Sequence, residues 1–401
     1  MPPRSLQSFA EAVRRELNEH LLPFWLDRAV DEAHGGFIGR MAHDGTVDPQ
    51  APKGLILNAR LLWTFSATYR VNRDPRCWDM AERAVDYFKD YFWDTTHGGA
   101  FWLLDREGHV LDDKKKIYGQ AFSIYALAEH YQAFGAGSAL QHAQQLFNLI
   151  EIHSRDRKNG GYIEVCNRDW SPAEDSRLSD KDMDAQKSMN NHLHLLEAYT
   201  NLYRVWPDGT LRERLAELVD LFERRIVDPS TGHLQHFFDT AWKPQSTDYT
   251  FGHDIEASWL LCEAVEVLDN AELTAPAQRL ALRLAQATLA EGLDEDGGLY
   301  YAGQAGEVTD PNREWWPQAE AVVGFLNAYA LSSDKALLDA AQKAWDYVEQ
   351  YFIDRQHGEW FWRVRPDGTP DPNEPKVSEW KSPYHNVRAC LEVLRRLTQI
   401  M

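Results

Sequence analysis

Apolar residues along this chain follow two alternating helical patterns. In the first pattern they recur every three or four positions, as in Trp78, Ala81, Val85 and Phe88, which is typical of an amphipathic helix with one wet face. In the second pattern apolar residues occupy most of the circumference of the helix, which predicts a buried helix. Six segments have the second pattern: 55–69, 117–131, 188–203, 251–268, 320–331 and 386–397. The alternation predicts two layers of helices.

A glycine-centred patch follows each amphipathic segment and recurs six times. Its first glycine stands at positions 35, 98, 160, 232, 297 and 358, so the spacing is 61–72 residues. An Asp precedes each patch by three or four residues, and a β-rich stretch such as 101–104 or 360–364 follows it up to a turn signal. We interpret each such stretch as a hairpin-like excursion between two helices.

Six amphipathic helices that alternate with six buried ones predict an all-α fold, an (α/α)6 barrel with short β-hairpin loops at one end. An open helical solenoid is the alternative, but a terminal repeat as well formed as the middle ones favours a closed ring. Because no low-complexity segment interrupts the repeat, residues 1–401 are predicted to form a single catalytic domain.

The net charge of −20 argues against nucleic acid or an anionic membrane as a partner, since such partners require clustered Lys and Arg. The only basic run, 114–116, is expected to be a solvated loop. The chain lacks a span of about 20 apolar residues and the apolar core of a signal peptide, which predicts a cytoplasmic protein. Four widely separated cysteines fit reduced thiols better than disulfides or a zinc site.

Polar triplets mark the starts of the six buried helices. They are Asn58-Ala59-Arg60, Gln120-Ala121-Phe122, His192-Leu193-His194, Asp254-Ile255-Glu256, Gln318-Ala319-Glu320 and Asn386-Val387-Arg388. In a closed ring these starts meet at one mouth of the barrel, where their side chains can line a common pocket. Helix capping explains Asn58 or Asp254 equally well when each is taken singly. It explains poorly why Arg60, His194 and Glu256 occur together at these positions.

Two histidines, His253 and His385, stand directly before two of these triplets. Glu256 lies three residues after His253 on the same helical face, so it is expected to orient that imidazole. His192 and His194 are about 200° apart on a helix, so only one of them can face the pocket, and spacing alone does not decide which. No metal-binding or nucleotide-binding motif is present, so neither a metal nor a cofactor is predicted. The 15 Trp, 16 Tyr and 17 Phe residues suit stacking on sugar rings.

Five segments carry a resemblance to a known family: 58–63, 189–199, 252–259, 315–320 and 380–386. They resemble the signature segments of the N-acylglucosamine 2-epimerase superfamily, most closely its cellobiose-epimerising members, over nearly the whole chain. The resemblance implies an (α/α)6 barrel and metal-free epimerisation at C2 of a reducing-end sugar. The implied substrates are β-1,4-linked disaccharides, with cellobiose converted to glucosyl-mannose and lactose to epilactose.

The resemblance also assigns site residues. It implies that His253 and His385 are the two catalytic acid/bases, and that His194 rather than His192 faces the pocket. The implied substrate-binding residues are Arg60, Tyr118, Asp182, Asn190, His194, Glu256, Trp316 and Trp380.

The chemistry fits these residue types. Epimerisation at C2 requires ring opening, removal of the C2 proton beside the aldehyde, and return of a proton to the other face. Two histidines on opposite walls suit this exchange, because imidazole titrates near neutral pH. Arg60 and a protonated His194 are expected to stabilise the enediolate.

Four other functions compete with this prediction. Two are an aldose–ketose (mannose) isomerase and an N-acylglucosamine 2-epimerase on the same scaffold. A glycoside hydrolase would use Glu256 and Glu320 as its two carboxylates. A non-catalytic sugar-binding protein is the fourth. We expect a monomer or homodimer, and the sequence leaves open the preferred disaccharide, side isomerase activity and thermal stability.

Overall fold

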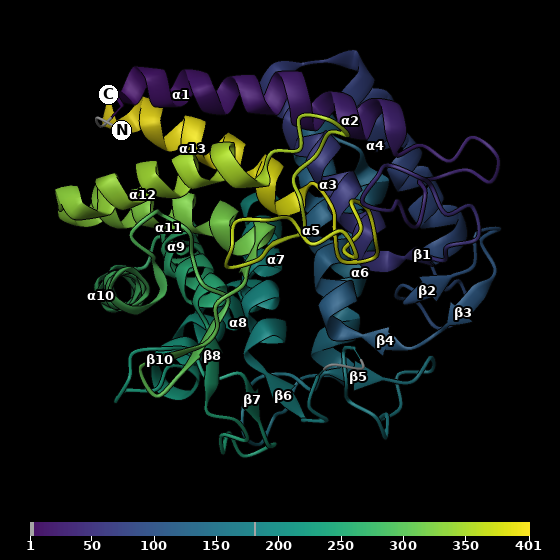
Figure 1. Cartoon of the computed structure of the whole chain (residues 1–401). Helices are drawn as coiled ribbons and strands as arrows, with labels where there is room; N and C mark the ends of the chain where they lie inside the picture. Colours follow the sequence, from purple (N-terminus) through teal and green to yellow (C-terminus); the bar gives the residue numbers. More distant parts are fainter. Residues whose placement is uncertain (1–3, 180–181) are drawn as a thin grey trace.

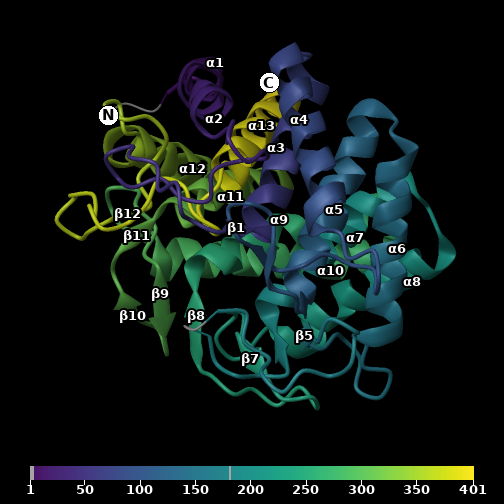
Figure 2. The same ribbon diagram turned by 90° about the vertical axis from the view of Figure 1, so that its right-hand side faces the viewer.

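The computed structural model describes residues 4–179 and 182–401. Its helices form two concentric layers (Figures 1 and 2). The inner helices are α3 (Leu55–Asn72), α5 (Ile117–Phe134), α7 (Met189–Val205), α9 (Phe251–Leu268), α11 (Trp315–Ser332) and α13 (Tyr384–Ile400). The outer helices are α1 (Leu6–Arg15) with α2 (Leu22–Arg28), α4 (Pro75–Tyr87), α6 (Gly137–His153), α8 (Gly209–Leu221), α10 (Ala271–Ala287) and α12 (Lys335–Tyr347).

The inner helices form a closed ring. Each contacts the next along the chain, and α13 returns to contact α3. An open solenoid would leave these two terminal helices apart, so that alternative is wrong and the predicted (α/α)6 barrel is confirmed. The inner helices are buried over most of their length, as their apolar circumference predicts.

Two inner helices begin earlier than the sequence pattern predicts. α11 begins at Trp315 instead of residue 320, and α13 begins at Tyr384 instead of residue 386. Pro317 lies in the first turn of α11, where a missing N–H costs no helical hydrogen bond, so it does not delay the helix. None of the helices described combines the length and the hydropathy that crossing a bilayer requires.

Five outer helices of the described chain contain a π-helical segment that the sequence pattern does not indicate. These segments are η1 (Glu16–Leu21), η2 (Phe88–Phe92), η3 (Phe222–Ile226), η4 (Thr288–Gly292) and η5 (Val348–Phe352). η2 to η5 each lie at the end of an outer helix, shortly before its glycine patch.

Short strands connect neighbouring repeats. They are β1 (Lys53–Gly54), β2 (Leu103–Leu104), β3 (Val110–Asp112), β4 (Lys115–Lys116), β5 (Val165–Cys166), β6 (Lys187–Ser188), β7 (Phe237–Phe238), β8 (Asp248–Thr250), β9 (Ala302–Gln304), β10 (Glu307–Asp310), β11 (Arg313–Glu314) and β12 (Arg363–Val364). Local antiparallel pairing closes the predicted turns, through β2–β3, β9–β10 and isolated bridges such as Cys166–Pro172 and Val364–Pro370. The pairs β1–β2, β4–β5, β6–β7, β8–β9 and β11–β12 each join the strand before an inner helix to the next repeat. The predicted hairpin-like excursions are therefore present, and they also form the seams between repeats.

A buried ion pair explains the Asp that precedes most glycine patches. Lys115 donates to Asp94 at 3.0 Å, and Lys187 donates to Asp156 at 2.9 Å. Asp31, Asp294 and Asp354 are paired in the same way with Lys53, Arg313 and Lys376. The expectation of a solvated loop at 114–116 is wrong, because Lys115 is fully buried in its ion pair and Lys116 is also buried.

The first residue of several polar triplets holds a glycine patch in place. Gln120 both accepts from the Ala100 amide and donates to its carbonyl, and Gln318 binds Leu299 in the same two ways. Asp254 accepts from the Leu234 amide at 2.8 Å. The capping alternative for Asp254 is therefore wrong, since its carboxylate binds the neighbouring patch.

Candidate active site

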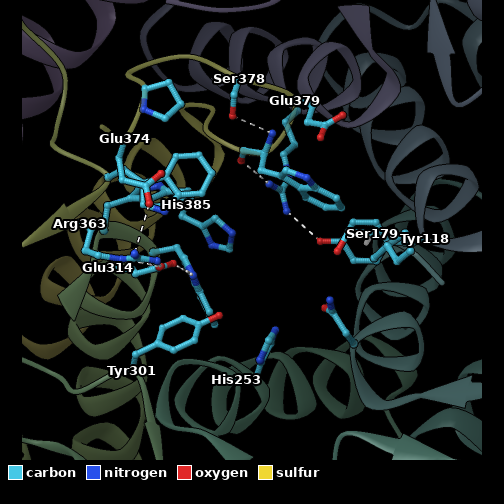
Figure 3. A pocket seen from close by; sticks show the side chains of 18 of the residues that line it. Tyr118, Ser179, His253, Tyr301, Glu314, Arg363, Glu374, Ser378, Glu379 and His385 are labelled. Carbon is cyan, nitrogen blue, oxygen red and sulfur yellow. Dashed lines mark hydrogen bonds and ion pairs between the residues drawn. The ribbon is translucent and has the colours of Figure 1, made fainter. Parts of the chain in front are cut away.

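The inner helices begin around a cavity of about 630 Å³ (Figure 3), which is within the usual size range of small-molecule sites. All ten residues predicted for the site line it. They are Arg60, Tyr118, Asp182, Asn190, His194, His253, Glu256, Trp316, Trp380 and His385. The predicted convergence of the helix starts at one mouth is therefore present.

His385 is backed by a carboxylate. Its Nδ1 lies 2.7 Å from Oε1 of Glu320 on α11. Burial raises the pKa of Glu320, and the hydrogen bonds it accepts from Trp259 at 3.0 Å and Arg388 at 2.7 Å oppose that rise by favouring the ionised form. With Glu320 ionised, His385 donates through Nδ1 and leaves the lone pair of Nε2 for the cavity. Burial, then the nearby arginines, holds the pKa of His385 well below 6.5.

His253 has a different partner from the predicted one. Its Nδ1 lies 2.5 Å from the hydroxyl of Thr250, and burial lowers its pKa well below 6.5. Glu256 instead accepts from Arg388 at 2.5 Å. The expectation that Glu256 orients His253 is wrong, because the helix turns its carboxylate toward the barrel axis where Arg388 lies.

His194 is held by Glu197, one helical turn further on. Nδ1 of His194 donates to Glu197 at 2.9 Å. Burial alone would raise the pKa of Glu197, but Arg388 and His194 hold it to about 2, while burial lowers the pKa of His194. Burial therefore opposes a protonated His194 while the Glu197 carboxylate favours one, and the expected protonation of His194 stays a prediction. His192 lies elsewhere, with its ring nitrogens bound to Ser188 and Tyr162.

Arg388 links these carboxylates across the barrel. Its guanidinium binds Glu197, Glu256 and Glu320, which lie on three other inner helices. Ligand atoms of Glu256, Glu320 and His385 lie within 4.8 Å of one another, an arrangement that resembles a metal site. Arg388 already supplies a positive charge there, so these carboxylates do not require a cation for charge balance.

Glu256 is the carboxyl that carries a proton. Burial, then the charge of Glu320, raises the pKa of Glu256 to about 8. Its Oε2 is buried and lacks a hydrogen-bond partner among the described residues. Near neutral pH this carboxyl can therefore donate a hydrogen bond to a ligand.

A cationic and aromatic wall lies across the cavity from His385. Arg60 donates to the Tyr118 hydroxyl at 3.0 Å and to the Trp380 carbonyl at 3.1 Å. Burial raises the pKa of Tyr118 to about 12, so its hydroxyl keeps its proton. Figure 3 shows Tyr118 on the side of the cavity away from His385 and Tyr301.

Trp316 packs against both candidate catalytic rings. Its ring centre is 4.7 Å from that of His253 and 5.6 Å from that of His385. On another wall, Asp182 accepts from the amide and hydroxyl of Ser179, both at 2.8 Å. Oδ1 of Asn190 is buried and unbonded within the described part of the chain.

Sequence reasoning missed two groups of residues at this site. The first is the set that orients the histidines: Glu197, Glu320, Thr250 and Arg388. Glu320 and Arg388 belong to the polar triplets expected at the pocket, but their contacts with the histidines and with one another were not predicted. The second is the outer rim, where Arg363 binds Glu314 and Glu374 (Figure 3).

Known proteins resemble the chain in sequence and in fold. Residues 36–389 match the sequence profile of N-acylglucosamine 2-epimerase (GlcNAc 2-epimerase). The chain is 44% identical to a cellobiose 2-epimerase of Bacteroides fragilis, over 96% of this chain and 98% of that protein. It is 37% identical to a cellobiose 2-epimerase of Dictyoglomus turgidum, over 98% of this chain and 100% of that protein. The solved structure of cellobiose 2-epimerase from Bacillus thermoamylovorans superposes with a TM-score of 0.92 at 40% identity, covering 97% of this chain and 100% of that one.

This likeness covers the barrel, the glycine patches and every segment that contributes to the cavity. It agrees with the resemblance of the five signature segments, and it confirms the predicted isomerase class. The chain belongs to the N-acylglucosamine 2-epimerase family.

Proposed function

We propose that this protein epimerises C2 of the reducing-end glucose in β-1,4-linked disaccharides such as cellobiose and lactose. The observation that carries the proposal is the pair His253 and His385, which line one cavity and both pack against Trp316. The relatives named cellobiose 2-epimerases support the same substrate class. We also infer that residues 1–401 act as one catalytic domain, because the cavity draws on residues from Arg40 to His385.

The proposed reaction removes the C2 proton of the open-chain sugar with one imidazole and returns a proton to the opposite face from the other. Breaking the C2–H bond leaves an enediolate, with negative charge on O1 and O2. The donors available to it are Arg60, the Tyr118 hydroxyl and the protonated carboxyl of Glu256. The three side chains are almost completely buried, and preorganised donors are most effective where water is excluded. Because Nδ1 of His194 binds Glu197, its Nε2 is the ring nitrogen available to a sugar hydroxyl.

The shape of the cavity favours a disaccharide over a single hexose. The cavity continues from the two histidines past Trp380 to a rim that includes Ser179 and Asp182 of the long third-repeat loop and Arg363 of β12. Charged and aromatic side chains at such a rim suit the hydroxyls and faces of a second sugar ring.

The hydrolase alternative requires two carboxylates on either side of a glycosidic bond. Glu256 and Glu320 both accept from the same Nη2 atom of Arg388, at 2.5 and 2.7 Å. The guanidinium thus occupies the place that the bond would need. The alternative of a non-catalytic binding protein gives no reason for two imidazoles that are held through Nδ1 and line the same cavity.

The test is to incubate the purified protein with cellobiose and with lactose and to follow the reducing end by NMR. We expect glucosyl-mannose from cellobiose and epilactose from lactose. Conversion of mannose to fructose, or of N-acetylglucosamine to N-acetylmannosamine, without reaction of either disaccharide would move the assignment to one of the two alternatives on this scaffold. Inactivity on all four sugars would contradict the proposal.

A further inference from the structure

A chain of hydrogen bonds connects the protein surface to Nδ1 of His253. Thr250 Oγ1 lies 2.5 Å from Nδ1 of His253 and 3.3 Å from Nε2 of His236. Nδ1 of His236 lies in turn 3.3 Å from a carboxylate oxygen of Asp248. The side chain of Asp248 is 52% exposed, that of His236 is 12% exposed, and Thr250 is 7% exposed. The chain therefore leads inward from solvent to the cavity.

Neither Thr250 nor His236 is among the described residues that line the cavity. β8 supplies Asp248 and Thr250, and His236 directly precedes β7. These residues can therefore act on a substrate only through His253. That makes them positioning residues.

We propose that Asp248, His236 and Thr250 form a relay that sets which nitrogen of His253 carries the proton, and so switches His253 between base and acid. The inference rests on the proposed acid/base role of His253. It concerns groups that do not touch the sugar.

The two states of the relay follow from what each group can donate. When His236 is neutral, its Nδ1–H points to Asp248, so Thr250 donates to Nε2 of His236 and accepts from Nδ1–H of His253. His253 then presents a bare Nε2, the form of a base. When His236 is charged, it donates to Thr250 and Thr250 donates to Nδ1 of His253. His253 then carries its proton on Nε2, the form of an acid.

The proton transfer balances in either direction. As Nε2 of His253 takes the C2 proton, its Nδ1 proton passes to Thr250, and the Thr250 proton passes to Nε2 of His236. The products are the enediolate, a neutral His253 and a His236 imidazolium. The negative charge of the enediolate thus faces a neutral ring, and the positive charge lies beside Asp248.

The surroundings of the two histidines explain why moving the positive charge from His253 to His236 helps the reaction. Burial disfavours a cation at His253, and His236, His194 and His385 are the titratable groups whose charges add to this effect. At the outer end, the hydrogen bond from His236 holds the pKa of Asp248 to about 2, so a carboxylate is present to stabilise the imidazolium. The Asp248 carboxylate thus lies beside His236, whereas a neutral hydroxyl lies beside Nδ1 of His253.

Thr250→Val tests the relay, because it keeps the branched shape and removes the hydroxyl. We expect kcat for cellobiose to fall about 10- to 100-fold, within the range that acid–base groups contribute, with KM nearly unchanged. Thr250→Ser should restore most of kcat. Thr288→Val is the matched control, since the buried Thr288 hydroxyl binds only a backbone carbonyl, and it should keep wild-type kcat.

¹⁵N NMR of the His253 ring supplies a readout that does not depend on turnover. In the wild type, the proton should move from Nδ1 to Nε2 as His236 becomes charged, and in Thr250→Val this link should be lost. A Thr250→Val variant with wild-type kcat would overturn the relay. So would a His253 tautomer that stays the same when His236 becomes charged. If the wild type does not epimerise any sugar, the proposed function fails, and the NMR result still decides the relay.

Discussion

The two walls that present the candidate catalytic histidines support them in different ways. On the α11 and α13 side, Glu320 holds His385, and Arg388 neutralises that carboxylate. On the α9 side, the neutral Thr250 hydroxyl holds His253. A carboxylate fixes one tautomer and stabilises an imidazolium, whereas a hydroxyl can accept or donate and favours neither tautomer. The reaction at C2 is thus served by two unlike imidazoles, one held in a single tautomer by a carboxylate and one able to change tautomer.

The largest expected effects come from removing either imidazole. His253→Ala and His385→Ala should each lower kcat for epimerisation by about 10²- to 10⁴-fold, because each removes one proton-transfer group. Steady-state kinetics with cellobiose measures this loss, and circular dichroism checks that the fold is retained. A variant with more than about a tenth of wild-type kcat would remove that histidine from the mechanism.

Arg388→Met should destabilise the whole barrel, because it leaves three buried glutamates without their shared cation. Breaking a buried ion pair in this way costs about 3–5 kcal/mol in the free energy of unfolding. Urea denaturation measures the change. Arg395→Met on the same helix is the control, since Arg395 is 39% exposed beside Glu392 and should cost under about 1 kcal/mol. Equal losses in the two variants would contradict the role given to Arg388.

Glu320→Gln tests the carboxylate side of the comparison. The amide keeps the shape and can still accept from Nδ1 of His385, but it no longer stabilises an imidazolium. We expect kcat to fall about 10- to 100-fold, with a smaller change in KM, since an acid–base group contributes at most about 10⁴-fold. A kcat equal to that of the wild type would show that His385 does not need the negative charge.

The pH profile tests the proton on Glu256. Burial and Glu320 raise the pKa of Glu256 to about 8, so its carboxyl is a donor below that pH and becomes an anion beside the enediolate above it. We therefore expect kcat/KM to fall several-fold as pH rises through about 8. Glu256→Gln should lack this alkaline decline, because its amide donates at every pH. An unchanged decline in that variant would assign it to another group.

The helices were predictable because their signals are local. Apolar periodicity located all six inner helices, and 251–268 agrees with α9 at both ends. The wrong predictions concern residues whose environment depends on a partner far away in the sequence. Lys115 was expected to be exposed to solvent, yet it is buried in an ion pair with Asp94, which precedes a glycine patch. The hairpin-like excursions are present as predicted, but the sequence did not indicate that their strands also pair with the strand before a neighbouring inner helix.

The same limit applies to the site. Positions at the helix starts indicated a common cavity, and the family resemblance supplied the roles. The residues that orient the histidines were not visible, because Glu197 and Arg388 meet only when the ring closes across 191 positions of sequence. Spacing of three suggested that Glu256 orients His253, but Arg388 offers that carboxylate a charged partner in the barrel centre.

The most direct test of the two-histidine account is proton wash-out at C2 in D₂O. Cellobiose and glucosyl-mannose are each incubated with His253→Ala and with His385→Ala, and loss of the C2 proton signal is followed by NMR. Each variant keeps one base, which reaches one face of C2. The account predicts that one variant exchanges the C2 proton of cellobiose only, and that the other exchanges that of glucosyl-mannose only. Exchange of the same sugar by both variants would contradict it.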